Sequence, residues 1–427
     1  MTWLEFYMTT RPITAVILGA GHRSLIYGDV SLRYPEQLKI VAVADINPSV
    51  AAFAAERYGV PKERVFHSLD ELVSAGRIAD VVINGTLDEF HVATSLPLLS
   101  LGYDMLLEKP FATSTAELAE LYVAARRNKS RVFICHVLRY AAYYCAIRQK
   151  LAEGAIGKVV SINMACDVSL HHTIISYVRG QWNNETISSP LMLAKGCHDM
   201  DLMMWLMGQN SPETVYSVGS DYRFDEKLAP QDAGTRCLLD CPLEKDCPYS
   251  AAKHYLGENC PHAYLVWRNA KLTESEKIEA LKTTNPHGRC VWKCNHKGVD
   301  HQTVTVTFSD GAVGVFTLTC GAPRDERRIH IVGTDGSISG VFEENAVILR
   351  RNDAEDGYTE EVIKPKIPAK ELHGGGDEAL TLDFCDYVRG VKPSDSCAEL
   401  SDSLAGHLAV FAAEKSRKTG KAVRIDM

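Results

Sequence analysis

Long apolar runs, internal repeats and low-complexity linkers are all missing from this chain of 427 residues. No apolar segment approaches the roughly 20 residues that a membrane-spanning helix needs, and the N-terminus lacks the successive regions of a signal peptide. Positive charge is in deficit, since 46 lysines and arginines face 54 aspartates and glutamates, a net charge of -8. This balance gives no electrostatic reason to bind nucleic acid or an anionic membrane. We therefore expect a cytoplasmic protein whose partner is a small molecule.

The length and the cysteine count set the next expectations. A chain of 427 residues exceeds what one hydrophobic core usually organises, so two domains are expected. Its 13 cysteines are an odd number, which favours reduced thiols or metal ligands over a disulfide framework. Residues 1–10 are expected to form a leader ahead of the first strand.

A glycine-rich turn follows the first predicted strand. The strand, Ile13 to Leu18, is almost continuously apolar and β-branched, as in a parallel strand buried on both faces. It runs into Gly19-Ala20-Gly21-His22-Arg23-Ser24. The first glycine permits a tight turn, the second lets the backbone approach a pyrophosphate, and the next helix offers free N–H groups to the anion. This stretch predicts a dinucleotide site.

An acidic residue ends the second predicted strand, Leu38 to Ala44. Asp45 stands at the spacing expected for a carboxylate that binds the adenosine ribose hydroxyls. NAD is therefore favoured over NADP, although Arg23 offers a guanidinium for a 2′-phosphate. The alternative is that Asp45 only caps a turn or a helix.

Glu108-Lys109-Pro110 closes a further apolar run, Met105 to Leu107. Ligands of doubly wound sheets bind outside the carboxyl ends of the strands. Lys109 is therefore expected to face the nucleotide site and to donate to a substrate oxygen. The same tripeptide is otherwise common in solvated surface turns.

Strands and helices alternate throughout the first half, and a helix from Tyr143 to Glu153 follows it. We place the domain boundary there, with residues 10–142 as the nucleotide domain and residues 143–427 as the second. Strands around Ser309-Asp310-Gly311 predict antiparallel sheet in the second domain. It also contains a cysteine-rich insertion at 230–300 and C-terminal helices that pack back on the first domain.

The first half resembles the glucose-fructose oxidoreductase, inositol dehydrogenase and rhizopine-catabolism (Gfo/Idh/MocA) family. The segments that carry the resemblance are Gly19-Ala20-Gly21, Asp45, Thr86 with His91, Glu108-Lys109-Pro110, Leu138-Arg139-Tyr140 and Gly154-x-x-Gly157-Lys158. It implies a Rossmann domain, a second α/β domain with a large, mostly antiparallel open sheet, and a homodimer or homotetramer formed through that sheet. It also implies a nicotinamide cofactor, for which the expected binding residues are Gly19, Ala20, Gly21, His22, Arg23, Asp45, Thr86, His91, Glu108 and Lys109.

In this family a Gly-x-His-x-x-Asp segment supplies the histidine that accepts a proton, and Gly196, His198 and Asp201 match it. A histidine has the pKa for general base work near neutrality. Many members carry an aspartate four residues before that histidine, where this chain has Ala194, followed by Lys195. The resemblance therefore leaves the usual lysine–aspartate–histidine relay open.

Polar and aromatic residues that suit sugar recognition stand in four places in the second half. Aromatic faces stack on sugar rings and arginine donates in a fork, although an ordinary surface loop or core histidine would use the same residues. The expected substrate-binding residues are His171, His172, Tyr177, Arg179, Trp182, Lys195, Asp201, His301 and His373.

Six cysteines fall within 58 residues, and turns with proline follow three of them. They are Cys237, Cys241, Cys247, Cys260, Cys290 and Cys294. Four such thiolates could hold a structural zinc and staple an irregular insertion. Reduced buried thiols and an iron–sulfur cluster are the alternatives.

We predict an NAD-dependent oxidoreductase acting on a sugar, sugar derivative or cyclitol hydroxyl, with Lys109 as hydrogen-bond donor and His198 as base. One alternative is a glycosidase that oxidises its substrate transiently, eliminates the glycosidic group and restores the hydride. The missing aspartate and the additional histidines favour this option slightly, because elimination needs a second base. Another alternative is an NAD-binding sensor without turnover.

Overall fold

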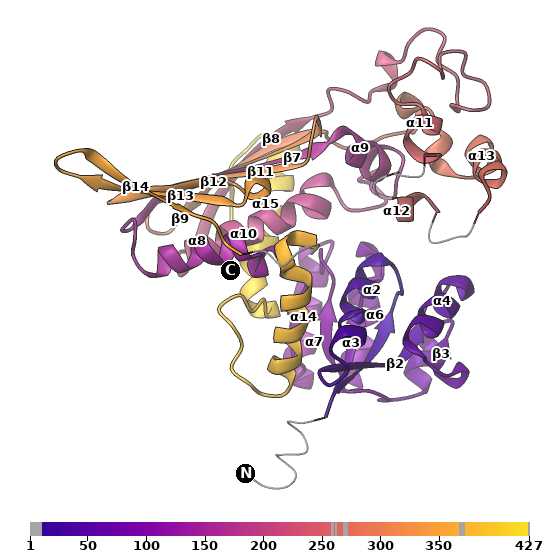
Figure 1. The fold of residues 1–427 in the computed structure, drawn as a ribbon, viewed down its shortest axis with the longest axis horizontal. Helices are drawn as coiled ribbons and strands as arrows, with labels where there is room; N and C mark the ends of the chain where they lie inside the picture. Colours follow the sequence, from indigo (N-terminus) through magenta and orange to yellow (C-terminus); the bar gives the residue numbers. More distant parts are fainter. Residues whose placement is uncertain (1–10, 258–259, 261–262, 268–271, 367–371, 426–427) are drawn as a thin grey trace.

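Two sheets organise the chain, as a computed structural model shows (Figure 1). It describes residues 11–257, 260, 263–267, 272–366 and 372–425. The leader expected at residues 1–10 lies outside this range. Within it, no helix is long and apolar enough to cross a membrane.

The first sheet is a parallel sheet of six strands in the order β3-β2-β1-β4-β5-β6. Its strands are β1 (Ile13–Leu18), β2 (Leu38–Ala44), β3 (Val65–Phe66), β4 (Val81–Asn84), β5 (Asp104–Leu107) and β6 (Val132–Ile134). The helices around it are α2 (His22–Gly28), α3 (Val30–Arg33), α4 (Pro48–Tyr58), α5 (Leu69–Ser74), α6 (His91–Ser100) and α7 (Thr115–Asn128). The strand order reverses between β1 and β4, and such a switch point is where open parallel sheets bind ligands.

The second sheet has nine strands in the order β14-β13-β12-β11-β7-β10-β9-β8-β15. They are β7 (Val159–Ser169), β8 (Pro212–Ser220), β9 (His301–Phe308), β10 (Val313–Ala322), β11 (Glu326–Gly333), β12 (Gly336–Val341), β13 (Ala346–Asp353), β14 (Gly357–Ile363) and β15 (Val423–Arg424). Neighbouring strands run antiparallel except β7 and β10. The predicted fold class, a Rossmann domain followed by a mostly antiparallel open sheet, is confirmed.

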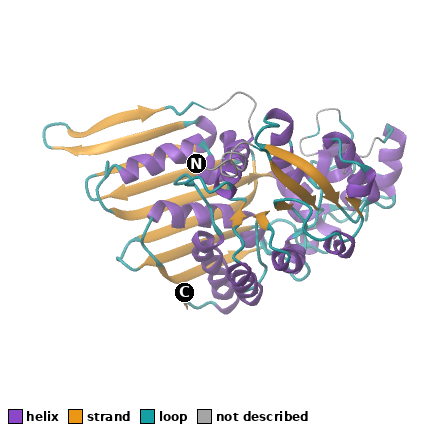
Figure 2. Cartoon of the chain, turned by 90° about the horizontal axis from the view of Figure 1, so that it is seen from below, coloured by secondary structure: helices purple, strands orange, loops and turns teal. Residues whose placement is uncertain are grey.

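Helices cover one face of this sheet. They are α8 (Ala142–Ala152), α10 (Cys197–Met207) and α15 (Leu400–Thr419) (Figures 1 and 2). The exposed side chains of Tyr216 and Val218 alternate with buried Val215 and Ser217 along β8, and Ser217 bonds to Ser416 of α15. Tyr216 and Val218 therefore lie on the uncovered face. The oligomer expected through that face remains a prediction.

The insertion between β8 and β9 is more regular than the sequence suggests. It contains the short helices α11 (Ala251–Tyr255), α12 (Ala263–Trp267) and α13 (Glu274–Lys282), the last opened by a capping box at Thr273. Its buried residues pack with Ile174, Ile175 and Val178 from the segment after α9 (Leu170–Thr173). The insertion is thus attached to the segment expected to bind sugar.

The C-terminal segment completes the first domain. Helix α14 (Gly376–Val388) places Leu380 and Phe384 in the core beside the parallel sheet. The edge strand β6 is bonded to the segment before α15, since Ile134 N–H donates to the Ala398 carbonyl at 2.8 Å. The nucleotide domain therefore depends on residues from the end of the chain.

Candidate functional site

The glycine-rich turn has the geometry that an anion-binding turn needs. Gly19 has φ +73°, and a Cβ there would lie 2.8 Å from the Thr86 amide nitrogen, whereas nothing lies within 4 Å of a Cβ built at Gly21. The first position is therefore closed to larger residues, and the second is open to a ligand. Helix α2 begins directly after it, at His22.

Asp45 fixes the shape of this turn from the end of β2. Its carboxylate accepts bonds from the backbone N–H groups of Ala20 and Asn47, each at 2.8 Å. The residue is only partly buried, so the carboxylate stands at the place where adenosine ribose hydroxyls lie in such domains. These positions fit a bound NAD.

Arg23 and Glu108, both expected to contact the cofactor, are bonded to each other. Arg23 Nε donates to Glu108 at 2.9 Å and Nη2 to Asp377 at 2.6 Å, while the Tyr27 hydroxyl donates to Glu108 at 2.6 Å. Burial alone would raise the pKa of Glu108, but the charges of Arg23 and Lys109 outweigh it and lower the pKa. A 2′-phosphate would have to compete with two carboxylates for Arg23.

Lys109 joins the first sheet to the second domain. It follows β5, and its Nζ donates to the Ala194 carbonyl at 2.9 Å. The Lys109–Pro110 peptide bond is cis. His91 is buried and its Nδ1 lies 2.7 Å from the Pro110 carbonyl oxygen, so it supports this turn. Thr86 bonds to Asn84 at the end of β4.

His198 stands at the start of α10, after the π-helical segment Met192–Gly196 that contains Ala194. Burial, and then the positive charge of Lys109, lower the pKa of His198 well below its ordinary value. A neutral imidazole beside an ammonium is therefore present near pH 7, as a proton acceptor requires. Its Nδ1 is buried without a hydrogen-bond partner among the residues that the structure describes.

Asp201, expected to bind substrate, is held in a buried ion pair. Arg139 donates to both carboxylate oxygens, at 2.7 and 2.6 Å, and both side chains are almost fully buried. His136 lies between this pair and the base, with Nε2 3.4 Å from Asp201 and a ring centroid 6.0 Å from that of His198. Sequence reasoning missed His136, which no motif marked.

Two stacked aromatic rings link the segment expected to bind sugar to the nucleotide domain. The rings of Tyr177 and Trp182 are stacked, with centroids 5.7 Å apart. Trp182 Nε1–H donates to Asp88, just after β4, at 2.8 Å. The predicted pair therefore lies where the two domains meet.

Three other predicted residues lie elsewhere. Arg179 is buried and donates to Arg289, Tyr255, Cys237 and Tyr249, so it anchors the insertion. His171 also meets the insertion, with its Nδ1 3.0 Å from that of His254. His301, the first residue of β9, pairs with the preceding residue, Asp300. The next side chain, Gln302, bonds to Glu414 of α15, so His301 points to the uncovered face.

Lys195, His373 and His172 surround the site more closely. His373 pairs with Asp377, the partner of Arg23, at 2.8 Å. His172 Nδ1 lies 3.3 Å from Asp325, at the start of β11. Burial and the charge of Arg327 lower the pKa of Lys195. Arg327, on β11, was not predicted, because nothing in its local sequence separates it from the other strand arginines.

The predicted zinc site is not supported. Among the residues that the structure describes, no group of three or more His, Cys, Asp or Glu could hold a metal ion, and none of the cysteines there forms a disulfide. Cys237 and Cys294 belong to the apolar core of the insertion. Cys237 accepts a bond from Arg179, and Cys294 donates to the Cys290 carbonyl. The insertion is stabilised by packing and by Arg179, and three of its six cysteines, Cys237, Cys290 and Cys294, are buried.

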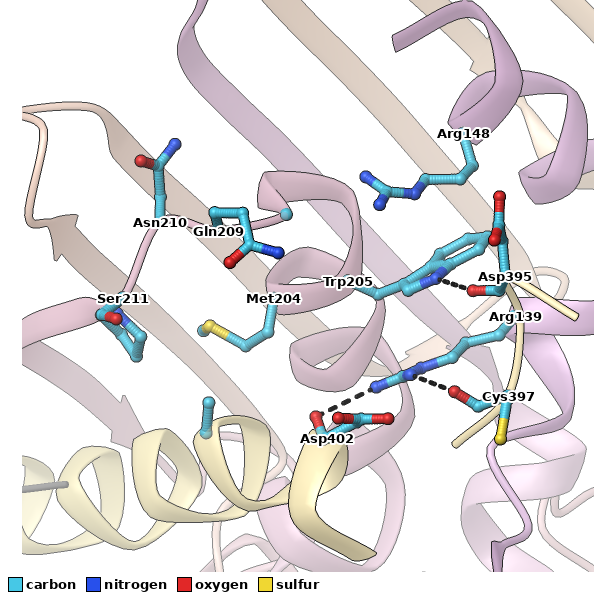
Figure 3. A pocket seen from close by; sticks show the side chains of 13 residues that line it. Arg139, Arg148, Met204, Trp205, Gln209, Asn210, Ser211, Asp395, Cys397 and Asp402 are labelled. Carbon is cyan, nitrogen blue, oxygen red and sulfur yellow. Dashed lines mark hydrogen bonds between the residues drawn. The ribbon is translucent and has the colours of Figure 1, made fainter. Parts of the chain in front are cut away.

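A separate cavity of about 470 Å³ contains none of the predicted site residues (Figure 3). Arg139, Arg148, Trp205, Asp395 and Asp402 are among the side chains that line it. Arg139 reaches from it to Asp201.

Both halves of the chain match models of one protein family. Residues 13–136 match its NAD-binding Rossmann fold, and residues 148–425 match its C-terminal alpha/beta domain. The putative oxidoreductase YteT of Bacillus subtilis is 25% identical over 373 residues, 82% of this chain and 83% of the relative. An inositol 2-dehydrogenase of Leifsonia xyli is 27% identical over 230 residues, 52% of this chain and 61% of that protein.

Solved structures share the fold. A levoglucosan dehydrogenase in complex with NADH and levoglucosan superposes with a TM-score of 0.71 at 18% identity, covering 98% of this chain and 100% of that one. None of these three proteins is named as a glycosidase or a sensor, so neither alternative gains support. The chain belongs to the Gfo/Idh/MocA family and is an oxidoreductase with an NAD-binding Rossmann domain.

Proposed function

We propose that this protein is an NAD-dependent dehydrogenase of a sugar-like or cyclitol hydroxyl. The observation that carries the proposal is the meeting of Lys109 with the segment before His198, through the bond to the Ala194 carbonyl. This bond brings the ammonium of Lys109, from the carboxyl end of the nucleotide sheet, to the segment of the second domain that leads into His198, whose imidazole is neutral. The inositol and levoglucosan dehydrogenases among the relatives support this substrate class.

The chain's own residues would activate the hydroxyl. Lys109 donates a hydrogen bond to its oxygen and stabilises the negative charge that develops there. His198 accepts the hydroxyl proton, which its lowered pKa permits near neutrality. A bound nicotinamide would supply the hydride acceptor. The residues that would hold this cofactor are the Gly19 to Gly21 turn and Asp45.

The family's lysine–aspartate–histidine relay is altered here. Ala194 offers only its backbone carbonyl to Lys109, so a carboxylate does not orient the lysine at that position. We propose that His136 orients His198 instead, since its ring stands edge-on to that of His198 and next to Asp201.

A panel of free sugars, cyclitols and aryl glycosides tests the proposal when NADH absorbance and aglycone release are followed together. NADH formation without aglycone release is expected. Aglycone release without net NADH would favour the glycosidase, and NAD binding without either signal would favour the sensor.

A further inference from the structure

The two ring nitrogens of His198 have different surroundings. The residue is partly exposed, and its Nδ1 is the ring nitrogen that is buried without a hydrogen-bond partner among the described residues. Nε2 is therefore the nitrogen available to a substrate, and Nδ1 faces the interior. A proton taken up at Nε2 can leave the ring from Nδ1, because an imidazole carries a proton on either nitrogen.

His136 is the buried histidine next to this ring. Its centroid lies 6.0 Å from that of His198, with the ring planes at 75°, a separation that one hydrogen-bonded water spans. His136 is 1% exposed, and its Nδ1 also has no partner in the described part of the chain. Buried polar nitrogens normally form hydrogen bonds. The two Nδ1 atoms can therefore be joined, directly or through one water.

Asp201 stands at the other nitrogen of His136, with its Oδ1 3.4 Å from Nε2. Burial raises the pKa of Asp201 although Arg139 opposes this shift, so the carboxylate can hold a proton transiently. Burial, and then the charges of Arg139 and Lys109, lower the pKa of His136, and Glu108 offsets them only in part. A proton that reaches His136 is therefore passed on rather than kept.

Arg139 connects this carboxylate to the cavity of about 470 Å³ (Figure 3). It lines the cavity and donates to both oxygens of Asp201. Asp201 also lies one helical turn before Met204, another lining residue. Two exposed residues, Gln209 and Asp402, line the cavity as well, so it communicates with bulk water.

We infer that the hydroxyl proton leaves the base through His136 and Asp201 into this cavity, on the side away from the substrate. The inference rests on the proposed function and makes His136 a proton relay. His198 takes the hydroxyl proton at Nε2 and releases another from Nδ1 to His136 Nδ1. His136 passes one from Nε2 to Asp201, which loses it to water in the cavity. The hydroxyl carbon is oxidised as its hydride goes to NAD, and one proton is released in each turnover.

His136→Gln tests the relay, because an amide keeps a donor and an acceptor but does not carry a proton. One turnover of NAD-loaded enzyme with an active sugar is followed in weak buffer by NADH absorbance and by a pH indicator. In the wild type, NADH and the proton should appear together. In His136→Gln the proton should appear at least about tenfold more slowly than NADH. Exposed His67→Gln should behave as the wild type.

A second variant removes the next carrier. Arg139→Met combined with Asp201→Leu leaves no unpaired buried charge from this ion pair, and it should delay the proton behind NADH in the same way. This variant decides the question if His136→Gln does not fold, as judged by circular dichroism.

Equal rates of NADH formation and proton release in these variants would overturn the inference. If both rates match the wild type, the proton leaves by another route. If both are slowed alike, His136 only orients the base. Either result leaves the proposed function intact, because NADH is still formed. If no sugar or cyclitol reduces NAD in the wild type, the proposed function fails and the relay with it.

Discussion

Charged side chains are paired on the nucleotide side of the proposed site and largely unpaired on the side of the second domain. On the nucleotide side, Arg23 donates to both Glu108 and Asp377. On the substrate side, Lys195 has no partner among the described residues, and Arg327 uses one of its three nitrogens. Since an unpaired buried polar group costs roughly 1–3 kcal/mol, the paired charges stabilise the fold, whereas the unpaired ones keep donors free.

The largest expected effect comes from breaking a paired charge. Arg139→Met should lower the free energy of unfolding by about 3–5 kcal/mol, because it leaves Asp201 buried without its cation. Urea denaturation followed by tryptophan fluorescence measures this loss. Adding Asp201→Leu should recover part of it.

Arg148, which lines the same cavity as Arg139, provides a control for this variant (Figure 3). Arg148 lies 5.6 Å from the Trp205 ring centroid and has no ion pair among the described residues. Arg148→Met should therefore cost less than about 1 kcal/mol. Equal losses for the two variants would contradict the distinction between paired and unpaired charges.

Removing the Lys109 ammonium should affect turnover more than folding. Lys109→Met is expected to lower kcat by at least about a hundredfold while NAD affinity stays within a few-fold. Steady-state kinetics and NAD titration by fluorescence measure the two effects, with exposed Lys39→Met as control. A parallel loss of NAD affinity would make Lys109 a cofactor ligand.

Removing the Asp45 carboxylate should have a smaller effect, on cofactor binding. Asp45→Ala should weaken NAD about tenfold and narrow the preference for NAD over NADP, because the ribose hydroxyls lose their carboxylate. Dissociation constants for both cofactors measure this change, and exposed Asp70→Ala serves as control. Unchanged constants would remove Asp45 from the ribose.

A further effect concerns the stability of the protein in acid. Burial lowers the pKa values of His136, His198 and His407 well below the ordinary value. Below pH 6.5 the unfolded chain binds protons that these folded imidazoles do not, so stability falls as the pH falls. The loss between pH 6.5 and 5.5 is about 1 kcal/mol for each histidine.

His407→Leu should remove the contribution of one histidine to the loss of stability in acid, and it leaves the proposed base, His198, unchanged. Denaturation at pH 7.5, 6.5 and 5.5 would show it as a flatter dependence of stability on pH (about 1 kcal/mol over the lower step). Exposed His67→Gln should leave the dependence unchanged. A slope identical to that of the wild type would mean that His407 is protonated in the folded protein.

Much of the fold could be predicted from the sequence, because the patterns that indicate it lie within short segments. The β-branched run before Gly19 and the spacing to Asp45 are properties of short segments, and the family resemblance ordered them. Contacts between residues far apart in the sequence could not be predicted. The pairing of Arg23 with Asp377 spans 354 positions, and the use of Arg179 by the insertion depends on how that segment packs.

The zinc prediction gains no support, for a related reason. Cysteine spacing describes distance along the chain, and the thiols of Cys237 and Cys294 ended in an apolar core rather than around a common centre. Arg327 and His136 carried no sequence signal, because single charged or aromatic residues in strands and turns are ordinary.

The bond between β6 and the segment before α15 has a consequence for biosynthesis. Ile134 receives its partner Ala398 only after about 260 further residues have been translated, a delay of roughly 13 to 50 s at 5–20 residues per second. Leu380 and Phe384 fill the same domain's core equally late. During synthesis the N-terminal half therefore exposes an unpaired strand edge and apolar surface until the C-terminal segment has left the ribosome.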